Sequence, residues 1–145
     1  MKTRKILAAV FIILAIVLGV SFYMKIHFPE DLTGYFKKSY YSQYGPLAIC
    51  IELLVAGIYL FVRHSKANFT LALFGFTALL DPIFDSVGLF STMVPLYGTL
   101  IFVICALVAL WLSFTDSFSL GKISFLAAFG SFILGNAVEL FFNYW

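Results

Sequence analysis

Long apolar runs separated by short polar segments dominate this chain. The runs cover residues 6–24, 46–62, 67–90, 94–114 and 123–142. A helix rises about 1.5 Å per residue, so each run is long enough to cross a hydrocarbon core of about 30 Å. Water is absent from that layer, so each segment must satisfy its own backbone polar groups, which favours helices. The pattern predicts an all-α fold: a single integral membrane domain over residues 1–145 with five transmembrane helices.

The basic residues between the runs predict an orientation. Positive charge gathers before the first run, between the second and third, and between the fourth and fifth, at Lys2, Arg4, Lys5, Arg63, Lys66 and Lys122. Cytoplasmic segments are enriched in Lys and Arg. We therefore expect the N-terminus in the cytoplasm, the C-terminus outside, and residence in the cell (inner) membrane. The first run, after Met-Lys-Thr-Arg-Lys, also allows the alternative of a cleaved signal peptide.

The longest polar segment, from Lys25 to Gly45, falls on the outer side in this orientation. It begins with Pro29 and two acids and carries two lysines further on, an order that a helix favours. Its apolar residues repeat at helical spacing, at Leu32, Tyr35, Phe36 and Tyr40. The segment is predicted to form a short amphipathic helix that lies in the outer interface.

Composition narrows the class of protein. Hydrophobic residues make up 63% of the chain and charged residues 11%, with a net charge of +2. A soluble domain carries about a quarter charged residues, and a nucleic-acid partner needs a basic patch. Cys50 and Cys105 are the two cysteines, and we expect them to pack as small apolar side chains. No nucleophile, phosphate-loop or dinucleotide motif is present, so the sequence predicts a non-enzymatic protein and specifies no cofactor.

Acidic residues inside the predicted helices are the candidate chemistry. They lie at a similar depth in the outer halves of three helices, at Glu52, Asp81, Asp85 and Glu139. An ionised acid facing lipid would cost about 3 kcal/mol near the helix centre, so we expect them to face the bundle.

The fifth run supports this orientation with a stripe of small residues that leads to Glu139 and passes beside Asn136, formed by Ala127, Ser131 and Gly135. Such a stripe lets another helix approach closely. Together with Glu52, Asp81 and Asp85, this makes Asn136 and Glu139 candidates for an ion or proton site. Three alternatives stay open for the acids: outer-loop lysines that fold over them, protonation, or a bound hard cation. A purely structural hydrogen-bonding role is the fourth.

Asp81 is followed by Pro82, which cannot donate a backbone hydrogen bond and disfavours helical geometry at the residue before it. A helix that ended at Leu80 would be too short to cross the membrane. The sequence therefore predicts a kinked third helix, with Asp81 placed at the kink.

One stretch resembles the DoxX/MauE group of small membrane proteins. The matching residues are Phe22, Lys25-Ile26 and Pro29, followed by Ile51-Glu52-Leu53-Leu54, Gly57 and Leu60. They cover about a quarter of the chain. The resemblance implies an accessory role in membrane redox chemistry or protein maturation, with Glu52 as the carried-over polar residue.

Three functional hypotheses follow. The leading one is a small accessory or subunit-type protein that packs with a larger membrane protein or with copies of itself in the lipid bilayer. The second is a transporter or channel for protons or cations, built on the outward-facing carboxylates. The third is a redox accessory of the DoxX type.

Overall fold

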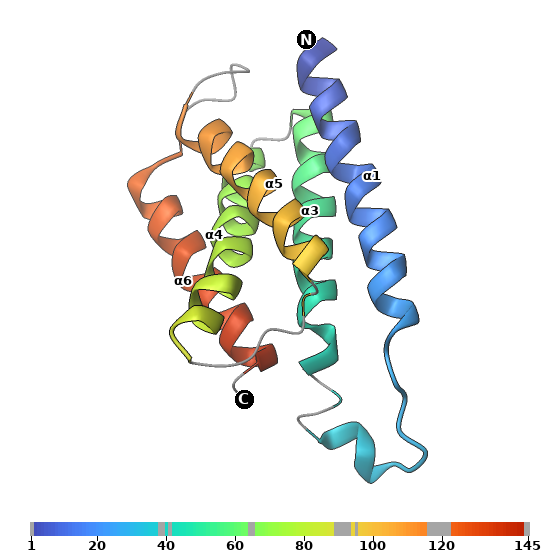
Figure 1. The fold of residues 1–145 in the computed structure, drawn as a ribbon. Coiled ribbons are helices and arrows are strands. Elements are labelled where there is room, and N and C mark those ends of the chain that lie inside the picture. The colour runs from blue at the N-terminus through green and yellow to red at the C-terminus, as the bar shows by residue number, and fades with distance from the viewer. Residues whose placement is uncertain are drawn as a thin grey trace.

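The computed structural model describes residues 2–37, 40, 42–63, 66–88, 94, 96–115 and 123–143. Within these residues the regular elements are helices (Figure 1). The long ones are α1 (Lys2–Met24), α3 (Gly45–Val62), α4 (Ala67–Ser86), α5 (Leu96–Phe114) and α6 (Phe125–Asn143). Four of them, α1, α3, α4 and α5, are long and apolar enough to cross a membrane. The described apolar part of α6, Phe125–Phe141, is shorter.

Successive helices run in opposite directions, and the two chain ends lie at opposite ends of the bundle (Figure 1). Helix α1 packs along α3 at one side of the molecule, and α4 contacts α3, α5 and α6. Helix α6 lies at the other side, against α4. We call the contact between α1 and α3 the α1–α3 seam, and the contact between α4 and α6 the α4–α6 seam.

The α1–α3 seam is apolar over its length. Buried residues of α1 recur at alternating spacings of four and three, at Ala8, Phe11, Ala15, Leu18 and Phe22. This spacing keeps one face of a helix against its neighbour. Gly57 of α3 marks a close approach, because a methyl group added there would lie 3.2 Å from Cβ of Phe11. Cys50 and Cys105 are buried in the apolar core as free cysteines.

Among the described residues, the helix predicted between α1 and α3 is present only as short pieces and not as one continuous helix. Thr33–Phe36 forms one 3₁₀ turn and Ser42–Tyr44 another. The side chain of Asp31 accepts the backbone N–H of Gly34 at 3.0 Å, which favours a turn over a continuing helix. Lys37 then adopts an extended conformation and ends the first turn.

Helix α4 continues through Pro82 and ends at Ser86, so the prediction that it does not stop at Leu80 is confirmed. It does not reach residue 90 as one helix. Gly88 has a φ of 81°, the left-handed conformation that commonly follows a helix end. Residues 89 and 90 lie outside the described part of the chain.

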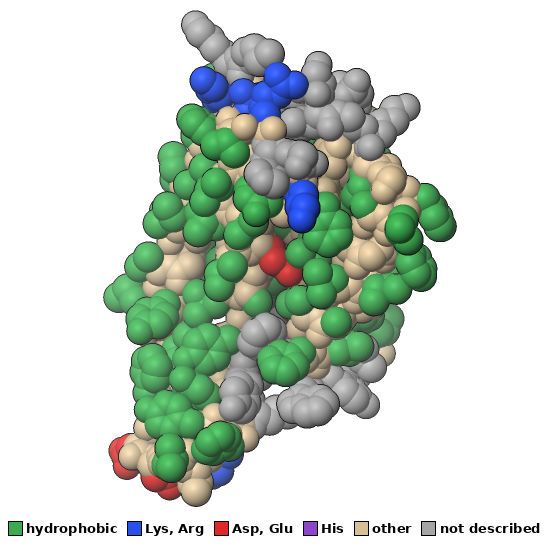
Figure 2. Space-filling model, turned by 180° about the vertical axis from the view of Figure 1, so that it is seen from behind, with side chains coloured by type: hydrophobic (Ala, Val, Ile, Leu, Met, Phe, Trp, Pro, Cys, Tyr) green, Lys and Arg blue, Asp and Glu red, His purple; other side chains and the backbone are tan. Residues whose placement is uncertain are grey.

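Seen from behind, the surface has an apolar band between charged ends (Figure 2). Basic side chains gather toward the upper end, and both acidic and basic ones appear at the lower tip. A small acidic area lies inside the band. The band agrees with the four membrane-length helices. The acidic area shows that carboxyl groups lie within this apolar band.

Candidate carboxyl site

Three of the four predicted acids lie together where α3, α4 and α6 meet. Asp81 of α4 and Glu139 of α6 have exposed fractions of 3% and 2%. Glu52 of α3 is partly buried. Asp85, one turn beyond Asp81, is exposed. We call Glu52, Thr77, Asp81 and Glu139 the carboxyl site.

Asp81 and Glu139 join α4 to α6 through a hydrogen bond between their side chains. An ionised carboxylate has acceptors only, so two carboxyl groups can share a hydrogen bond when one of them carries a proton. Both are almost fully buried, and neighbouring like charges repel strongly in a low-dielectric interior. The arrangement is therefore one in which two carboxyl groups on neighbouring helices can share a proton.

Glu52 approaches this pair from α3. Oγ1 of Thr77 lies 3.3 Å from Oε1 of Glu52 and 2.8 Å from the carbonyl oxygen of Leu73. Threonine has a single hydroxyl proton, and the shorter contact is the better hydrogen bond. Oε2 of Glu52 is buried and has no hydrogen-bond partner among the described residues. Glu52 is thus the least satisfied carboxyl of the site, and it interacts electrostatically with Glu139.

The site lies in the half of the bundle where α3 begins and where α4 and α6 end. Glu52 is about 10 Å along α3 from Gly45, and Asp81 is about 8 Å along α4 from Ser86. Glu139 is likewise within about 6 Å of the end of α6 at Asn143. Each carboxyl group therefore lies nearer to this end of the bundle than to the opposite end.

The small-residue stripe of α6 faces α4, as the sequence predicted. Ser131, Gly135 and Glu139 are buried at four-residue spacing. A methyl group added at Gly135 would lie 3.0 Å from Oγ1 and 3.2 Å from the backbone nitrogen of Thr77. Gly135 therefore sets the distance between α4 and α6 one turn away from the hydrogen bond of Glu139. Toward the opposite end of the seam, Phe76 packs against Phe132.

Two other sequence candidates lie on the same helices as the buried carboxyls, Asn136 on α6 and Pro82 on α4. The side-chain amide of Asn136 donates to the carbonyl oxygen of Phe132 at 2.8 Å, on its own helix. Pro82 follows Asp81 inside α4 and leaves the carbonyl of Ala78 without its helical N–H donor.

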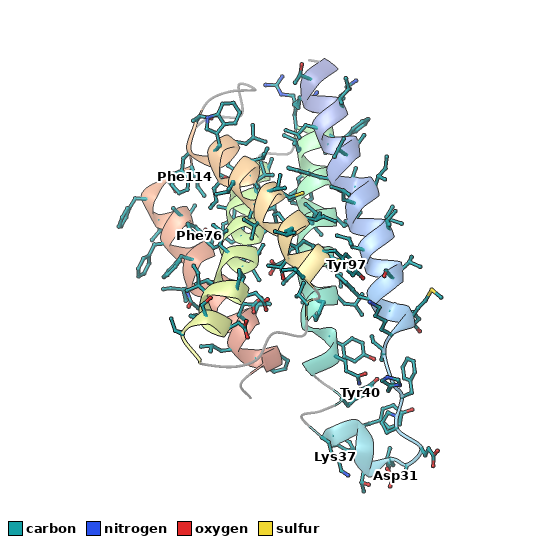
Figure 3. All side chains as sticks on the ribbon, in the orientation of Figure 1. Asp31, Lys37, Tyr40, Phe76, Tyr97 and Phe114 are labelled. Carbon is teal, nitrogen blue, oxygen red and sulfur yellow. The ribbon has the colours of Figure 1, made fainter. Side chains whose placement is uncertain are left out.

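The described lysines between α1 and α3 have other partners or positions. Nζ of Lys25 donates to the hydroxyl of Tyr97, which is labelled in Figure 3, at 3.0 Å, and this bond ties the end of α1 to α5. Lys37 lines a hollow formed by residues between α1 and α3. Lys38 lies outside the described residues. The helices α3, α4 and α6 contain no Lys, Arg or His in their sequences. The interpretation in which Lys25 covers the acids is therefore wrong.

The burial of Arg4 against the end of α3 was not predicted from the sequence. It has an exposed fraction of 5%, and its Nη1 donates to the carbonyl oxygens of Leu60 and Phe61 at 2.5 Å each. The guanidinium thus caps the C-terminal end of α3, where unsatisfied carbonyls favour a cation. A signal was available, because Arg4 stands four residues before Ala8 and continues the buried series of α1.

The described residues contain no group of three or more His, Cys, Asp or Glu side chains arranged to hold a metal ion.

No protein-family model, curated protein or solved structure matches the chain. The resemblance to the DoxX/MauE group therefore stays a prediction that depends on its motif residues.

Proposed function

We propose that this chain is a multi-pass membrane protein that binds and exchanges protons at the carboxyl site. The observation that carries the proposal is the hydrogen bond between the buried side chains of Asp81 and Glu139. Ionisable groups inside membrane helices are costly, and they commonly mark proton or ion pathways. A shared proton lowers that cost while leaving a group that can take up and release it.

The proposed topology has five crossings, with the N-terminus in the cytoplasm of a cell-membrane protein. The described bases at the N-terminal end of the bundle, Arg4, Lys5, Arg63 and Lys66, fit the cytoplasmic side. Helix α6 spans about 28 Å, enough to cross a core of about 30 Å with a small local adjustment. The chain ends at opposite ends of the bundle also fit an odd number of crossings.

In this proposal each carboxyl has a separate task. Asp81 and Glu139 hold the resident proton between α4 and α6. Glu52 is the third acceptor, because its Oε2 is buried without a described partner while the residue as a whole is partly exposed. Thr77 lies between α3 and α6 and can turn its single hydroxyl proton from Leu73 toward Glu52. Protons would therefore enter from the outer side and pass between Glu52 and the pair.

Infrared difference spectroscopy tests the shared proton directly. In lipid nanodiscs, a pH change should alter the carbonyl-stretch bands of protonated carboxylic acids. Asp81→Asn and Glu139→Gln keep side-chain size and should each remove a band or shift it. Asp85→Asn is the matched control, because it removes an exposed carboxyl from the same helix. Equal spectra for the Asp85, Asp81 and Glu139 variants would contradict a protonated pair.

Proton flux into proteoliposomes tests the exchange. A potassium-diffusion potential should drive proton entry into vesicles that contain the wild-type protein. Glu139→Gln should abolish this flux while the variant keeps its thermal unfolding transition, and Asp85→Asn should retain it. A wild-type protein that shows the infrared bands but no flux would keep the shared proton and remove the transport role.

An accessory or subunit role is the second candidate, and the outer face of α6 favours it. Gly130 has no heavy atom of the described residues within 4 Å of an added methyl group. Its neighbours Phe125 and Leu126 are among the most exposed apolar residues of the molecule. An open glycine on an exposed face allows a further helix to approach closely. Purification in mild detergent should then recover a stoichiometric partner or dimer that Gly130→Leu disrupts, and an unchanged monomer would contradict this role.

A further inference from the structure

The segment between α1 and α3 exposes large apolar side chains although it lies outside the helices. The exposed fractions of Leu32 and Phe36 are 75% and 72%, and Phe28 is also exposed. In water this arrangement would be unfavourable, since each such side chain loses about 1.5–3 kcal/mol relative to burial. We call residues 26–37, 40 and 42–44 the outer segment.

An aromatic series connects the outer segment to the exposed surface of α1. Tyr23, in the last turn of α1, packs against Phe28 with ring centroids 6.2 Å apart. Phe28 packs against Tyr40 at 6.3 Å, and Tyr40 contacts Tyr35 at 5.1 Å. Tyr23 and its neighbour Met24 are exposed. The exposed apolar surface of α1 is therefore joined to the aromatic side chains of the outer segment by the contact between Tyr23 and Phe28.

Hydrogen bonds hold the outer segment in this shape. The side chain of Gln43 accepts the backbone N–H of His27 at 2.7 Å and donates to its carbonyl oxygen at 3.1 Å. The hydroxyl groups of Tyr40 and Tyr44 lie 2.6 Å apart. The segment is therefore preorganised, which lowers the ordering cost of binding to a surface.

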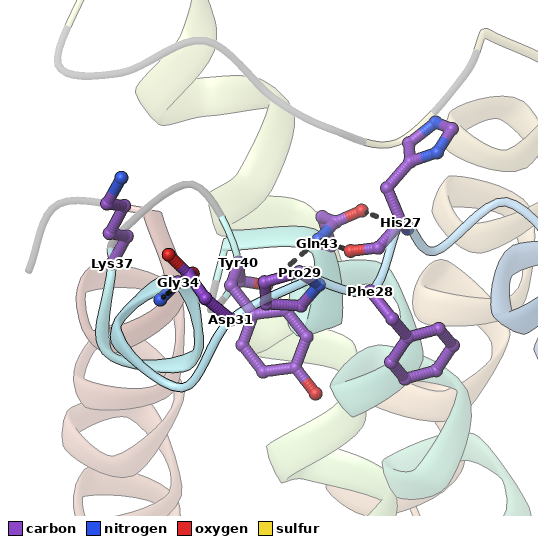
Figure 4. Close-up of a pocket in the computed structure, with 8 residues that line it drawn as sticks. All are labelled: His27, Phe28, Pro29, Asp31, Gly34, Lys37, Tyr40 and Gln43. Atoms are coloured by element: carbon purple, nitrogen blue, oxygen red, sulfur yellow. Dashed lines mark hydrogen bonds between the residues drawn. The ribbon is translucent and has the colours of Figure 1, made fainter.

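The outer segment has two faces. Figure 4 shows the rings of Phe28 and Tyr40 on one side, with the side chains of His27 and Lys37 directed to the other. A hollow of about 480 Å³ lies between them, with Asp31 on its rim. From behind, the apolar surface continues down to this region, and charge appears at its tip (Figure 2). Aromatic and charged groups are thus separated across a thin structure.

We propose that the outer segment is an interfacial anchor that lies in the headgroup layer of the outer leaflet, with its aromatic face toward the lipid. Both of its ends join helices of membrane-spanning length, α1 and α3, so it must lie at the membrane surface. Tyrosine rings are enriched at this layer because one end is apolar and the other polar. The continuity with the exposed surface of α1 selects lipid as the occupant, and Glu30, Asp31 and Lys37 mark the water side. The anchor is independent of the proton function.

Spin labels at single cysteines test the depth of the anchor. Leu32→Cys and Phe36→Cys would be labelled in a background with Cys50→Ala and Cys105→Ala, and reconstituted in nanodiscs of phosphatidylcholine and phosphatidylglycerol. Oxygen partitions into lipid and a charged nickel chelate stays in water. We expect labels at positions 32 and 36 to collide several-fold more with oxygen than with the chelate. The matched control is Glu30→Cys, for which we expect the reverse.

Equal chelate access at positions 30, 32 and 36 would overturn the proposal. So would dipolar broadening among labels at position 36, because it would place a second copy of the chain on this face. An unlabelled double variant, Leu32→Ser with Phe36→Ser, covers the case in which labels perturb the fold. It should fall in thermal stability in nanodiscs while keeping wild-type helical content. An unchanged unfolding temperature there would also overturn the anchor.

Discussion

The α1–α3 seam and the α4–α6 seam join their helices by different means. Along α1–α3 the contacts are apolar, and the polar groups lie at the ends, with Arg4 on the carbonyls of α3 and Gln43 on the backbone of His27. Along α4–α6 a glycine allows close approach, and a hydrogen bond between Asp81 and Glu139 completes the seam. One seam is closed at its ends by groups bound to backbone atoms, and the other has a carboxyl pair in its interior.

Because of this difference, we expect the two seams to respond differently to a change in pH. Arginine keeps its charge at all ordinary pH values and a backbone carbonyl does not titrate, so the α1–α3 seam should respond little to protons. In the proposed function the two carboxyls of the α4–α6 seam share a proton, which would link the geometry of this seam to its protonation. We therefore expect α1 and α3 to act as a fixed support, and α6 to move relative to α4 when the proton leaves.

The largest effect is expected from removing the Arg4 cap. Arg4→Met removes the guanidinium from the carbonyls of Leu60 and Phe61, and should lower the free energy of unfolding by about 2 kcal/mol. Arg4→Lys should cost less, because the ammonium keeps the charge but lacks the planar fork of donors. Unfolding in mixed detergent micelles, followed by circular dichroism, measures both.

The matched control is Lys5→Met, which removes the same charge from an exposed neighbour that lies 5.7 Å above the ring of Phe61. If Lys5→Met and Arg4→Met destabilised the protein equally, the effect would come from net charge at the membrane surface. In that case Arg4 would not act as a specific cap at the end of α3.

A smaller effect is expected from Gly135→Ala. The added methyl group lies within 3.2 Å of the backbone nitrogen of Thr77, so α6 must shift from α4, at a cost of about 1 kcal/mol. The shift should also change the infrared bands of the carboxyl pair one turn away. Gly130→Ala, on the open face of α6, should leave both stability and bands nearly unchanged. If Gly135→Ala changed stability but no band, the pair would not depend on the seam's spacing.

Much of this organisation could be predicted because it depends on the lengths of apolar runs and on residue spacing. The run lengths located the five long helices of the described residues, with bounds that differ by a few residues. Ser131, Gly135 and Glu139 were predicted to face inward from their four-residue spacing, and the structure places them against α4. Asp81 and Glu52 were predicted to approach Glu139 from their depth.

Other features could not be predicted from these patterns. Whether Asp85 joins the site depends on how α4 turns after Pro82, and the structure leaves it exposed. The outer segment has helical spacing, but the side chain of Asp31 stabilises a turn at Gly34 instead. The position of Arg4 depends on where α3 ends beside α1, which is a tertiary property.

The smallest effect concerns the outer end of the α1–α3 seam. The hydrogen bond with Tyr40 raises the pKa of Tyr44 to about 12, above the ordinary value of about 10. The fold therefore favours the neutral phenol, and this contribution to stability is fully present below about pH 10 and is lost as the pH rises toward 12. Tyr40→Phe removes the partner, so the pKa of Tyr44 should fall toward its ordinary value and the loss of stability across this window should shrink.

Unfolding temperatures measured between about pH 9 and pH 12 would show the change, with lysine titration common to both proteins. The tyrosinate absorbance of wild type minus Tyr44→Phe would report the pKa itself. A Tyr44 pKa that stayed raised in Tyr40→Phe would assign the shift to burial rather than to the hydrogen bond. In that case the outer end of the α1–α3 seam would be held by the Gln43 contact with His27 and by ring packing, with no titratable element in it.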